Sequence, residues 1–428
     1  MNLKKILDEQ TKLLVLDNKT LRYLKHETES IVEKLKEEIK NEKIDADVFV
    51  GGSYARGTLV KKGKYDIDIF IRFDWKLDNI SDILEDIVKS AGKALNLNFS
   101  KIHGSRDYFR LETKDNLYFE IIPVYRIKTP QEARNVTDLS YFHVNYVRKK
   151  LRGNNIANEI LLAKQFCEAQ GVYGAETYIL GFSGYGLECL IIYYKSLANM
   201  LKKLIKAKER IVIDIEKHYK NKSDVLFSLN ENKLQSPIIL VDPTWKERNV
   251  LSALNKENFK KFQERAREFL KKPSAYFFEL HEFDADKLKR FAKEKNAEFL
   301  DIIIVTDRQS GDIAGAKMKK FARFLEFEIA RYFDILRKEF LYKEGQKSNF
   351  YIVGKAKKEI IKRGPPINMK KNVEDFRKYN KDTFEKGGFL HASERINFSL
   401  KEFLEKFKEK QKDKIRNMGI IEIELKVF

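Results

Sequence analysis

Residues 51–73 read GGSYARGTLVKKGKYDIDIFIRF, a glycine-rich turn followed by a hydrophobic stretch that carries two aspartates. Alternate side chains of a β-strand point to the same face, so Asp66 and Asp68 share one face and the isoleucines beside them share the other. Two carboxylates held side by side are costly unless a cation lies between them, and Mg²⁺ prefers oxygen ligands. The stretch therefore predicts a strand that presents a metal-binding pair.

The turn before this strand carries groups suited to phosphate. GGS is expected to bend into a helix that begins near Tyr54, so that its backbone N–H groups, the Ser53 hydroxyl and the Arg56 guanidinium can bind phosphate oxygens. A polyphosphate-binding loop followed by a carboxylate pair is the front half of a phosphoryl-transfer site. Either motif alone is usually a plain turn or a solvated strand end, and it is their combination that predicts function.

A third acidic residue is needed if two metal ions are bound, because one ion activates the attacking hydroxyl. Glu120 is the candidate, since it is the one acid in the otherwise apolar stretch LYFEIIPVY. Glu112, on the preceding expected strand, is a second candidate. The alternative for Glu120 is a glutamate on an edge strand that faces water.

Length and pattern indicate several domains. The 428 residues exceed one ordinary core, and roughly two to four domains are expected. Residues 1–140 predict an α/β head with a mixed sheet, residues 141–272 a helical central domain or neck, and residues 273–428 an α+β body with a helical tail. The predicted fold class is therefore α+β and multidomain.

Four local patterns give specific expectations. Apolar spacing predicts a long helix over residues 13–43, a strand over 274–280 and another long helix over 314–340. The most apolar run, residues 187–205, is interrupted by Glu188 and a lysine. It is therefore expected to be a buried helix and not a membrane span.

Charge and cysteine content narrow the class of protein. A formal net charge of +20 favours a polyanionic partner such as nucleic acid, although the lysines are scattered along the chain as in a lysine-rich proteome. Cys167 and Cys189 form no CxxC motif and have no histidine cluster, so neither a zinc site nor a disulfide framework is indicated. A cytoplasmic setting without a membrane is expected, since the first residues also lack the apolar core of a signal peptide.

Several motifs together resemble a known family. GS followed by a DxD strand and a carboxylate on a later strand resembles the polymerase β-type nucleotidyltransferase superfamily. The segments YFHVNYVRKKL, LLAKQFCEAQGVYGAETYILGFSGYGLECLIIYY, VDPTWKERNV and RGPPINMKKNVEDFRKY are similar to successive signatures of the class I, archaeal-type CCA-adding enzymes. The resemblance covers nearly the whole chain, and the YGAE and GFSGY block is its most specific part.

The resemblance implies a CTP(ATP):tRNA nucleotidyltransferase that builds or repairs the 3′ CCA end of tRNA without a template. The tRNA 3′-hydroxyl would attack the α-phosphorus of CTP or ATP in a site with two Mg²⁺ ions, and pyrophosphate would leave. The family architecture of head, neck, body and tail implies that tRNA is held mainly through its phosphates, which the basic composition suits. Members are often homodimers.

The resemblance also assigns residues. It gives the metals to Asp66, Asp68 and Glu120, and the nucleotide to Ser53, Arg56, His143, Lys164, Tyr173 and Arg248. Among these, Lys164 and Tyr173 match positions that contact phosphates or sugar, and Arg248 matches the arginine implicated in reading the base edge. The family usually has aspartate where this chain has Glu120, so the third carboxylate lies on a longer arm.

Two alternatives remain open, a related enzyme and a protein of a different functional class. A related poly(A) polymerase or oligoadenylate-forming enzyme would share the head and prefer ATP throughout. A non-catalytic RNA-binding protein would keep a decayed head, against which stands the presence of the Ser53, Arg56, Asp66 and Asp68 set. The GFSGY glycines, Gly181 and Gly184, are expected to serve close packing or a tight turn.

Overall fold

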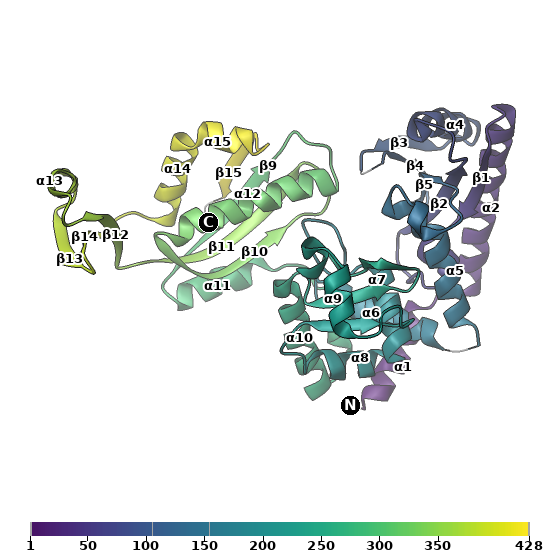
Figure 1. Cartoon of the computed structure of the whole chain (residues 1–428), viewed down its shortest axis with the longest axis horizontal. Helices are drawn as coiled ribbons and strands as arrows, with labels where there is room; N and C mark the ends of the chain where they lie inside the picture. Colours follow the sequence, from purple (N-terminus) through teal and green to yellow (C-terminus); the bar gives the residue numbers. More distant parts are fainter. Residues whose placement is uncertain (1, 105, 154, 427–428) are drawn as a thin grey trace. The chain divides into compact units, whose positions relative to one another are not determined.

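The computed structural model describes residues 2–104, 106–153 and 155–426, and the chain divides into the compact units Met1–His281 and Glu282–Phe428 (Figure 1). Both units combine helices with β-sheets. The predicted α+β multidomain class is therefore confirmed. The finer division of the chain into head, central domain and body with tail stays a prediction.

The first unit begins with a layer of helices on a sheet whose strand order is β1-β2-β5-β4-β3. The elements are α1 (Leu3–Leu14), α2 (Asn18–Asn41), β1 (Ala46–Val50), α3 (Gly52–Arg56), β2 (Tyr65–Phe73), α4 (Ile80–Ala94), β3 (Asn98–Ile102), β4 (Tyr108–Glu112) and β5 (Leu117–Tyr125). β2 pairs antiparallel with β1 and parallel with β5, so the sheet is mixed as predicted. The long helices α2 and α4 pack against each other and against this sheet (Figure 1).

The central strand β2 has the alternation expected of it. Ile67, Ile69 and Ile71 are fully buried in one apolar core with residues of α2 and α4. Asp68 is only partly buried and Asp66 is exposed. The isoleucines thus fix the strand to the helical layer, and the carboxylates are directed away from it.

Helices dominate the rest of the first unit, where a small sheet of order β6-β7-β8 completes the fold. The elements are α5 (Ser140–Leu151), α6 (Ile156–Ala169), α7 (Gly184–Tyr194), α8 (Leu197–Leu204), β6 (Ile211–Asp214), α9 (Lys222–Ser228), β7 (Ile238–Asp242), β8 (Trp245–Asn249) and α10 (Lys256–Lys271). The apolar run 187–205 is buried as predicted, although Lys195 with φ 70° divides it between α7 and α8.

The second unit is built on a sheet of order β10-β11-β9-β15 and a smaller one of order β12-β14-β13. Its elements are α11 (Ala285–Glu294), β9 (Glu298–Val305), α12 (Asp312–Ala330), β10 (Phe333–Leu341), β11 (Lys347–Ala356), β12 (Glu359–Pro366), α13 (Lys370–Tyr379), β13 (Asp382–Lys386), β14 (Phe389–Arg395), α14 (Leu400–Lys410), α15 (Lys412–Asn417) and β15 (Glu422–Lys426). α12 packs on β10 and β11, and α11 packs on β9 and β11.

Three local predictions were wrong in part. The expected helix over 13–43 is two helices, because the extended backbone at Val15 ends α1 and the Asp17 side chain accepts a hydrogen bond from the Thr20 N–H at 2.8 Å to begin α2. The expected strand over 274–280 is instead the 3₁₀-helix Ala275–Phe278, which buries two phenylalanines in the core of the first unit.

The third error concerns residues 314–340, where the sequence predicted one long helix. α12 ends at Ala330, and Phe333–Leu341 form β10 by antiparallel pairing with β11. The spacing of the apolar residues in this segment is compatible with a helix and with a strand. The strand pairing that decides between the two is made with residues further along the chain.

The described residues contain no helix that is both long enough and apolar enough to cross a membrane.

Candidate active site

The parallel pairing of β2 with β5, two inner strands, brings the predicted carboxylates to one face of the sheet. Asp68 lies opposite Glu120 in the register, and Asp66 lies opposite Tyr118. Residues paired in this way point to the same face, so the three acids Asp66, Asp68 and Glu120 share a face. The neighbouring strand β4 adds Arg110, which lies opposite Glu120 and forms an ion pair with it, with 2.7 Å between Nη2 and Oε1.

Close approach of the turn to β2 explains the glycines that precede Ser53. Gly52 has φ +62°, and a Cβ atom built on it would lie 1.7 Å from Oδ2 of Asp68. A Cβ atom on Gly51 would lie 2.3 Å from the Phe70 ring. Glycine alone allows this contact. The short helix α3 that follows carries Ser53 and Arg56 and is closed by Gly57 in the left-handed conformation.

The carboxylates raise one another's pKa. Burial, followed by the nearby Glu120 carboxylate, raises the pKa of Asp68 to about 7 against the opposing charge of Arg56. Burial also raises the pKa of Glu120, although the Arg110 guanidinium acts in the opposite direction. An acidic cluster of this kind is stabilised by added positive charge.

The carboxylates of Asp66, Asp68 and Glu120 are chemically suited to bind a divalent metal ion. Carboxylate oxygens are the ligands that Mg²⁺ prefers, and burial, with the Glu120 charge as the next cause, raises the pKa of Asp68. In residues 2–104, 106–153 and 155–426, however, no group of three or more His, Cys, Asp and Glu side chains is gathered as a metal-ligand set. The Arg110 ion pair holds Glu120, so Asp66 and Asp68 are the pair that fits a metal directly, and Glu120 fits after leaving Arg110.

Arg56 and Lys164 meet at a glutamate that the sequence analysis did not assign to the site. Glu188, in the middle of the apolar helix α7, is fully buried and lies 2.8 Å from Arg56 Nε and 2.8 Å from Lys164 Nζ. It also accepts a hydrogen bond of 2.6 Å from the Thr58 hydroxyl. We call Arg56, Thr58, Lys164 and Glu188 the buried ion cluster. Burial acts to raise the pKa of Glu188, but the charges of Arg56 and Lys164 lower it to about 2.

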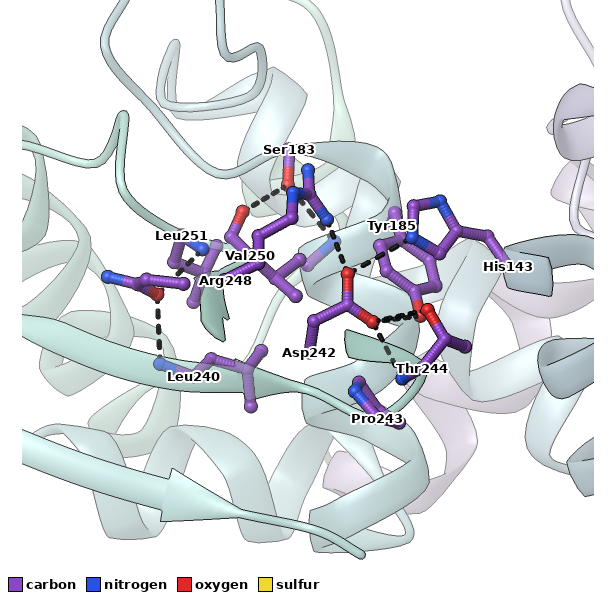
Figure 2. A network of polar contacts seen from close by, with 12 residues as sticks. His143, Ser183, Tyr185, Leu240, Asp242, Pro243, Thr244, Arg248, Val250 and Leu251 are labelled. Carbon is purple, nitrogen blue, oxygen red and sulfur yellow. Dashed lines mark hydrogen bonds and ion pairs between the residues drawn. The ribbon is translucent and has the colours of Figure 1, made fainter. Parts of the chain in front are cut away.

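Asp242 is a second carboxylate that the sequence did not assign to the site, and it contacts both His143 and Arg248 (Figure 2). Its Oδ2 atom lies 3.0 Å from His143 Nε2 and 2.7 Å from Arg248 Nη1. Its Oδ1 atom accepts hydrogen bonds from the Tyr185 hydroxyl at 3.2 Å and from the Thr244 N–H and hydroxyl at 2.8 Å each. The His143 ring also stacks on Tyr185, with 4.1 Å between ring centroids.

The charge state of this pair follows from its contacts. Burial acts to raise the pKa of Asp242, but the hydrogen bond from His143 and the charges of His143 and Arg248 hold it well below its usual range. Burial lowers the pKa of His143. Asp242 is therefore an anion that accepts the proton carried on His143 Nε2, and it holds that ring and Arg248 in place.

Tyr173 and the GFSGY glycines pack closely together. A Cβ atom on Gly184 would lie 2.9 Å from the Tyr173 hydroxyl, and one on Gly181 would lie 2.2 Å from the Val172 carbonyl oxygen. The prediction that these glycines serve close packing is confirmed. Tyr173 forms an isolated bridge with Phe182, so the loop that carries it is fixed against the start of α7.

The structure brings the predicted residues together around Arg56. Burial lowers the pKa of His143 and of Lys164, and the Arg56 charge lowers both further, whereas burial raises the pKa of Tyr173 and the Arg56 charge opposes that rise. Arg56 acts on Asp68 in the same way. Arg248 is connected to these residues by its ion pair with Asp242. The sequence prediction did not include Glu188, Asp242 or Arg110. The signal that could have found them is a charge within or at the end of a hydrophobic segment.

Comparisons with known proteins agree with this arrangement. Residues 32–135 match the family described as "Nucleotidyltransferase domain", and residues 158–279 match "tRNA nucleotidyltransferase, second domain". A solved structure of a cytoplasmic RNA terminal U-transferase has a TM-score of 0.51 at 13% identity and covers 66% of this chain and 99% of that chain. At this identity the likeness shows a shared polymerase β-type fold.

Similar sequences point to one family. The CCA-adding enzyme of Nanoarchaeum equitans is 35% identical over 83% of this chain and 85% of that protein. The CCA-adding enzyme of Methanocaldococcus jannaschii is 28% identical over 89% of this chain and 85% of that protein. The resemblance predicted from the motifs is thereby confirmed, and this chain belongs to the family of CCA-adding enzymes.

Proposed function

We propose that this chain builds and repairs the 3′-terminal CCA of tRNA from CTP and ATP without a template. The observation that carries the proposal is the carboxylate face of β2, with Asp66 and Asp68, set against the Gly52–Arg56 turn in a member of the CCA-adding family. The tRNA is held chiefly through its phosphates, which the net charge of +20 favours.

The reaction forms one bond and breaks one. The 3′-hydroxyl oxygen of the tRNA attacks the α-phosphorus of the nucleotide, the bond from the α-phosphorus to the oxygen bridging to the β-phosphorus breaks, and its electron pair leaves with pyrophosphate. The hydroxyl proton passes to solvent water. Nucleotidyltransferases use a divalent metal, here proposed as two Mg²⁺ ions held by Asp66, Asp68 and Glu120, which supplies positive charge to the reacting oxygens.

The chain's own residues bind and orient the nucleotide. Ser53 and Arg56 bind the triphosphate and Tyr173 contacts the phosphates or the sugar, whereas Lys164 donates to Thr58 and Glu188. His143 and Arg248, which both contact Asp242 Oδ2 (Figure 2), bind the sugar and the base. The planar guanidinium of Arg248 has five N–H donors, of which Asp242 occupies one side, so donors remain for the edge of a base.

The test is incubation of tRNA that lacks its 3′ end with labelled CTP and ATP, separately and together, followed by sequencing of the products. We expect CMP addition with CTP alone and a product that ends at CCA with both nucleotides. Long A tracts would favour a poly(A) polymerase instead. Absence of any transfer, with tRNA binding intact, would leave the non-catalytic alternative.

Asp242→Asn tests the proposed selection of the base. The substitution keeps the shape of the side chain but removes the anion that holds Arg248 and His143, so the preference for CTP over ATP at the first position is expected to fall about 10- to 100-fold. The measurement is the ratio of kcat/KM values for the two nucleotides. Asp214→Asn is the matched control, since Asp214 ends the neighbouring strand β6 and accepts a hydrogen bond from the Tyr219 N–H. An unchanged ratio in Asp242→Asn would contradict the assignment.

A further inference from the structure

Glu188 is a fully buried carboxylate for which the proposed chemistry has no use. It lies within α7, whose sequence GYGLECLIIYY is otherwise apolar, and its neighbours along the helix are buried as well. Burying a charge costs several kcal/mol unless it is paired and hydrogen-bonded. The burial of Glu188 in α7 therefore indicates that it has partners that require a fixed negative charge beside them.

Those partners come from two separate parts of the first unit. Arg56 and Thr58 lie at and just after α3, the turn that carries the proposed triphosphate ligands, and Lys164 lies on α6. Glu188 Oε1 accepts from the Thr58 hydroxyl and from Lys164 Nζ, and Oε2 faces Arg56 Nε. One oxygen of the Glu188 carboxylate thus contacts Lys164 of α6 and Thr58, and the other contacts Arg56.

Lys164 is fully engaged within the protein. Its Nζ donates to the Thr58 carbonyl oxygen at 3.0 Å, to the Thr58 hydroxyl at 3.1 Å and to Glu188 at 2.8 Å. An ammonium group has three protons to donate, so these three acceptors satisfy it, and only 3% of the residue is exposed. In this arrangement Lys164 supports the end of the α3 turn and has no donor left for a phosphate.

We propose that Glu188 is a positioning residue for nucleotidyl transfer, which orients the Arg56 guanidinium toward the triphosphate and is itself held by Lys164 and Thr58. The inference rests on the proposed function, because it takes Arg56 as a triphosphate ligand. Arg56 Nε and Glu188 Oε2 form an ion pair without hydrogen-bond geometry, so the N–H groups of the guanidinium remain for phosphate oxygens. Lys164 then acts through Glu188 and not on the nucleotide.

The same contact keeps Arg56 away from the carboxylates of β2. After Glu188, Asp68 is the acid whose charge acts most strongly on the pKa of Arg56. Without Glu188, Arg56 is drawn toward Asp68, where it neutralises a proposed metal ligand and leaves the triphosphate. Glu188 therefore separates the phosphate-binding cation from the metal-binding anions.

A double-mutant cycle tests the inference. The dissociation constant of CTP is measured at equilibrium, without tRNA, for the wild type, Glu188→Gln, Arg56→Ala and the double variant. We expect each single substitution to weaken CTP binding about 10- to 100-fold, and the double variant to be within about threefold of Arg56→Ala. Effects that multiply in full would show that Glu188 does not act through Arg56 and would overturn the inference. If Arg56→Ala binds CTP as tightly as the wild type, the triphosphate role of Arg56 in the proposed function fails, and the inference fails with it.

Folding is followed separately, because Glu188→Gln leaves Lys164 as a buried charge with one partner fewer. Adding Lys164→Met removes that charge, so the thermal midpoint of the Glu188→Gln/Lys164→Met protein is expected to return toward the wild-type value while CTP binding stays weak. Recovery of both the midpoint and CTP affinity would mean that Glu188 only stabilises the fold. Glu159→Gln is the matched control: this partly buried glutamate of α6 accepts a hydrogen bond from the Leu197 N–H at 2.7 Å, and CTP affinity should not change.

Discussion

Replacing Asp68 by asparagine is expected to lower the rate of CMP addition by ~10³-fold or more, because it removes a proposed metal ligand from the reacting centre. The affinity for tRNA should stay within about threefold of the wild type, since phosphate contacts dominate RNA binding. Single-turnover incorporation of labelled CMP and a tRNA-binding titration measure the two effects. Substantial residual incorporation would contradict the assignment of Asp68.

The stability of this variant separates lost chemistry from lost folding. Because the pKa of Asp68 is raised from 3.8 to about 7 in the folded chain, the folded state binds this proton more tightly than the unfolded state does. In a chelating buffer the ionised carboxylate therefore destabilises the fold above pH 7, and the cost disappears as the pH falls toward 3.8. Asp68→Asn should melt no lower than the wild type at about pH 8, and the difference should shrink in acid.

Gly52→Ala is expected to reduce CMP addition about 100-fold or more, although it changes no charged or hydroxyl group. The new methyl would lie 1.7 Å from Asp68 Oδ2, so either the carboxylate or the turn with Ser53 has to move. Displacements of about 1 Å at a reacting centre can cost about 100-fold in rate. The measurement is kcat/KM for CTP with a tRNA primer.

Gly57→Ala is the matched control for this substitution. Gly57 also has a left-handed backbone, with φ +72°, and it closes the same turn, but a Cβ atom there meets nothing within 4 Å. Both alanines incur a backbone cost of about 1–2 kcal/mol, and only the one at Gly52 meets the carboxylate. Equal loss of activity in the two variants would mean that backbone strain, and not the contact with Asp68, limits the site.

The sequence predicted the parts of the site that depend on local pattern. Alternation in β2 is a property of neighbouring residues, so the common face of Asp66 and Asp68 could be read directly. That Glu120 lies opposite Asp68 depends on the pairing of β2 with β5, which no local pattern specifies. Its position as the one acid in an otherwise apolar stretch supplied the candidate, and the strand register supplies its place.

Glu188 and Asp242 were missed for the same reason. Glu188 bonds to Thr58 across 130 positions of the chain, and Asp242 bonds to His143 across 99. Glu188 interrupts an apolar segment that was interpreted only as a buried helix, and Asp242 ends an apolar segment whose charge was not interpreted. A charge in such a segment is itself informative, because its burial requires a partner of opposite charge. The third error of fold, at residues 314–340, has another cause, because β10 is fixed by its antiparallel pairing with β11, the next strand along the chain, and helical spacing of apolar residues does not report such a pairing.

The buried ion cluster has a consequence for movement. Arg56 and Thr58 precede residue 140 and Lys164 and Glu188 follow it, so the cluster joins the sheet layer to the helices behind it. A hinge between these parts would leave charges without partners in a dry interior. We therefore expect the sheet layer and these helices to move as one body, so that this side of the proposed nucleotide site stays fixed while the 3′ end of the RNA is extended.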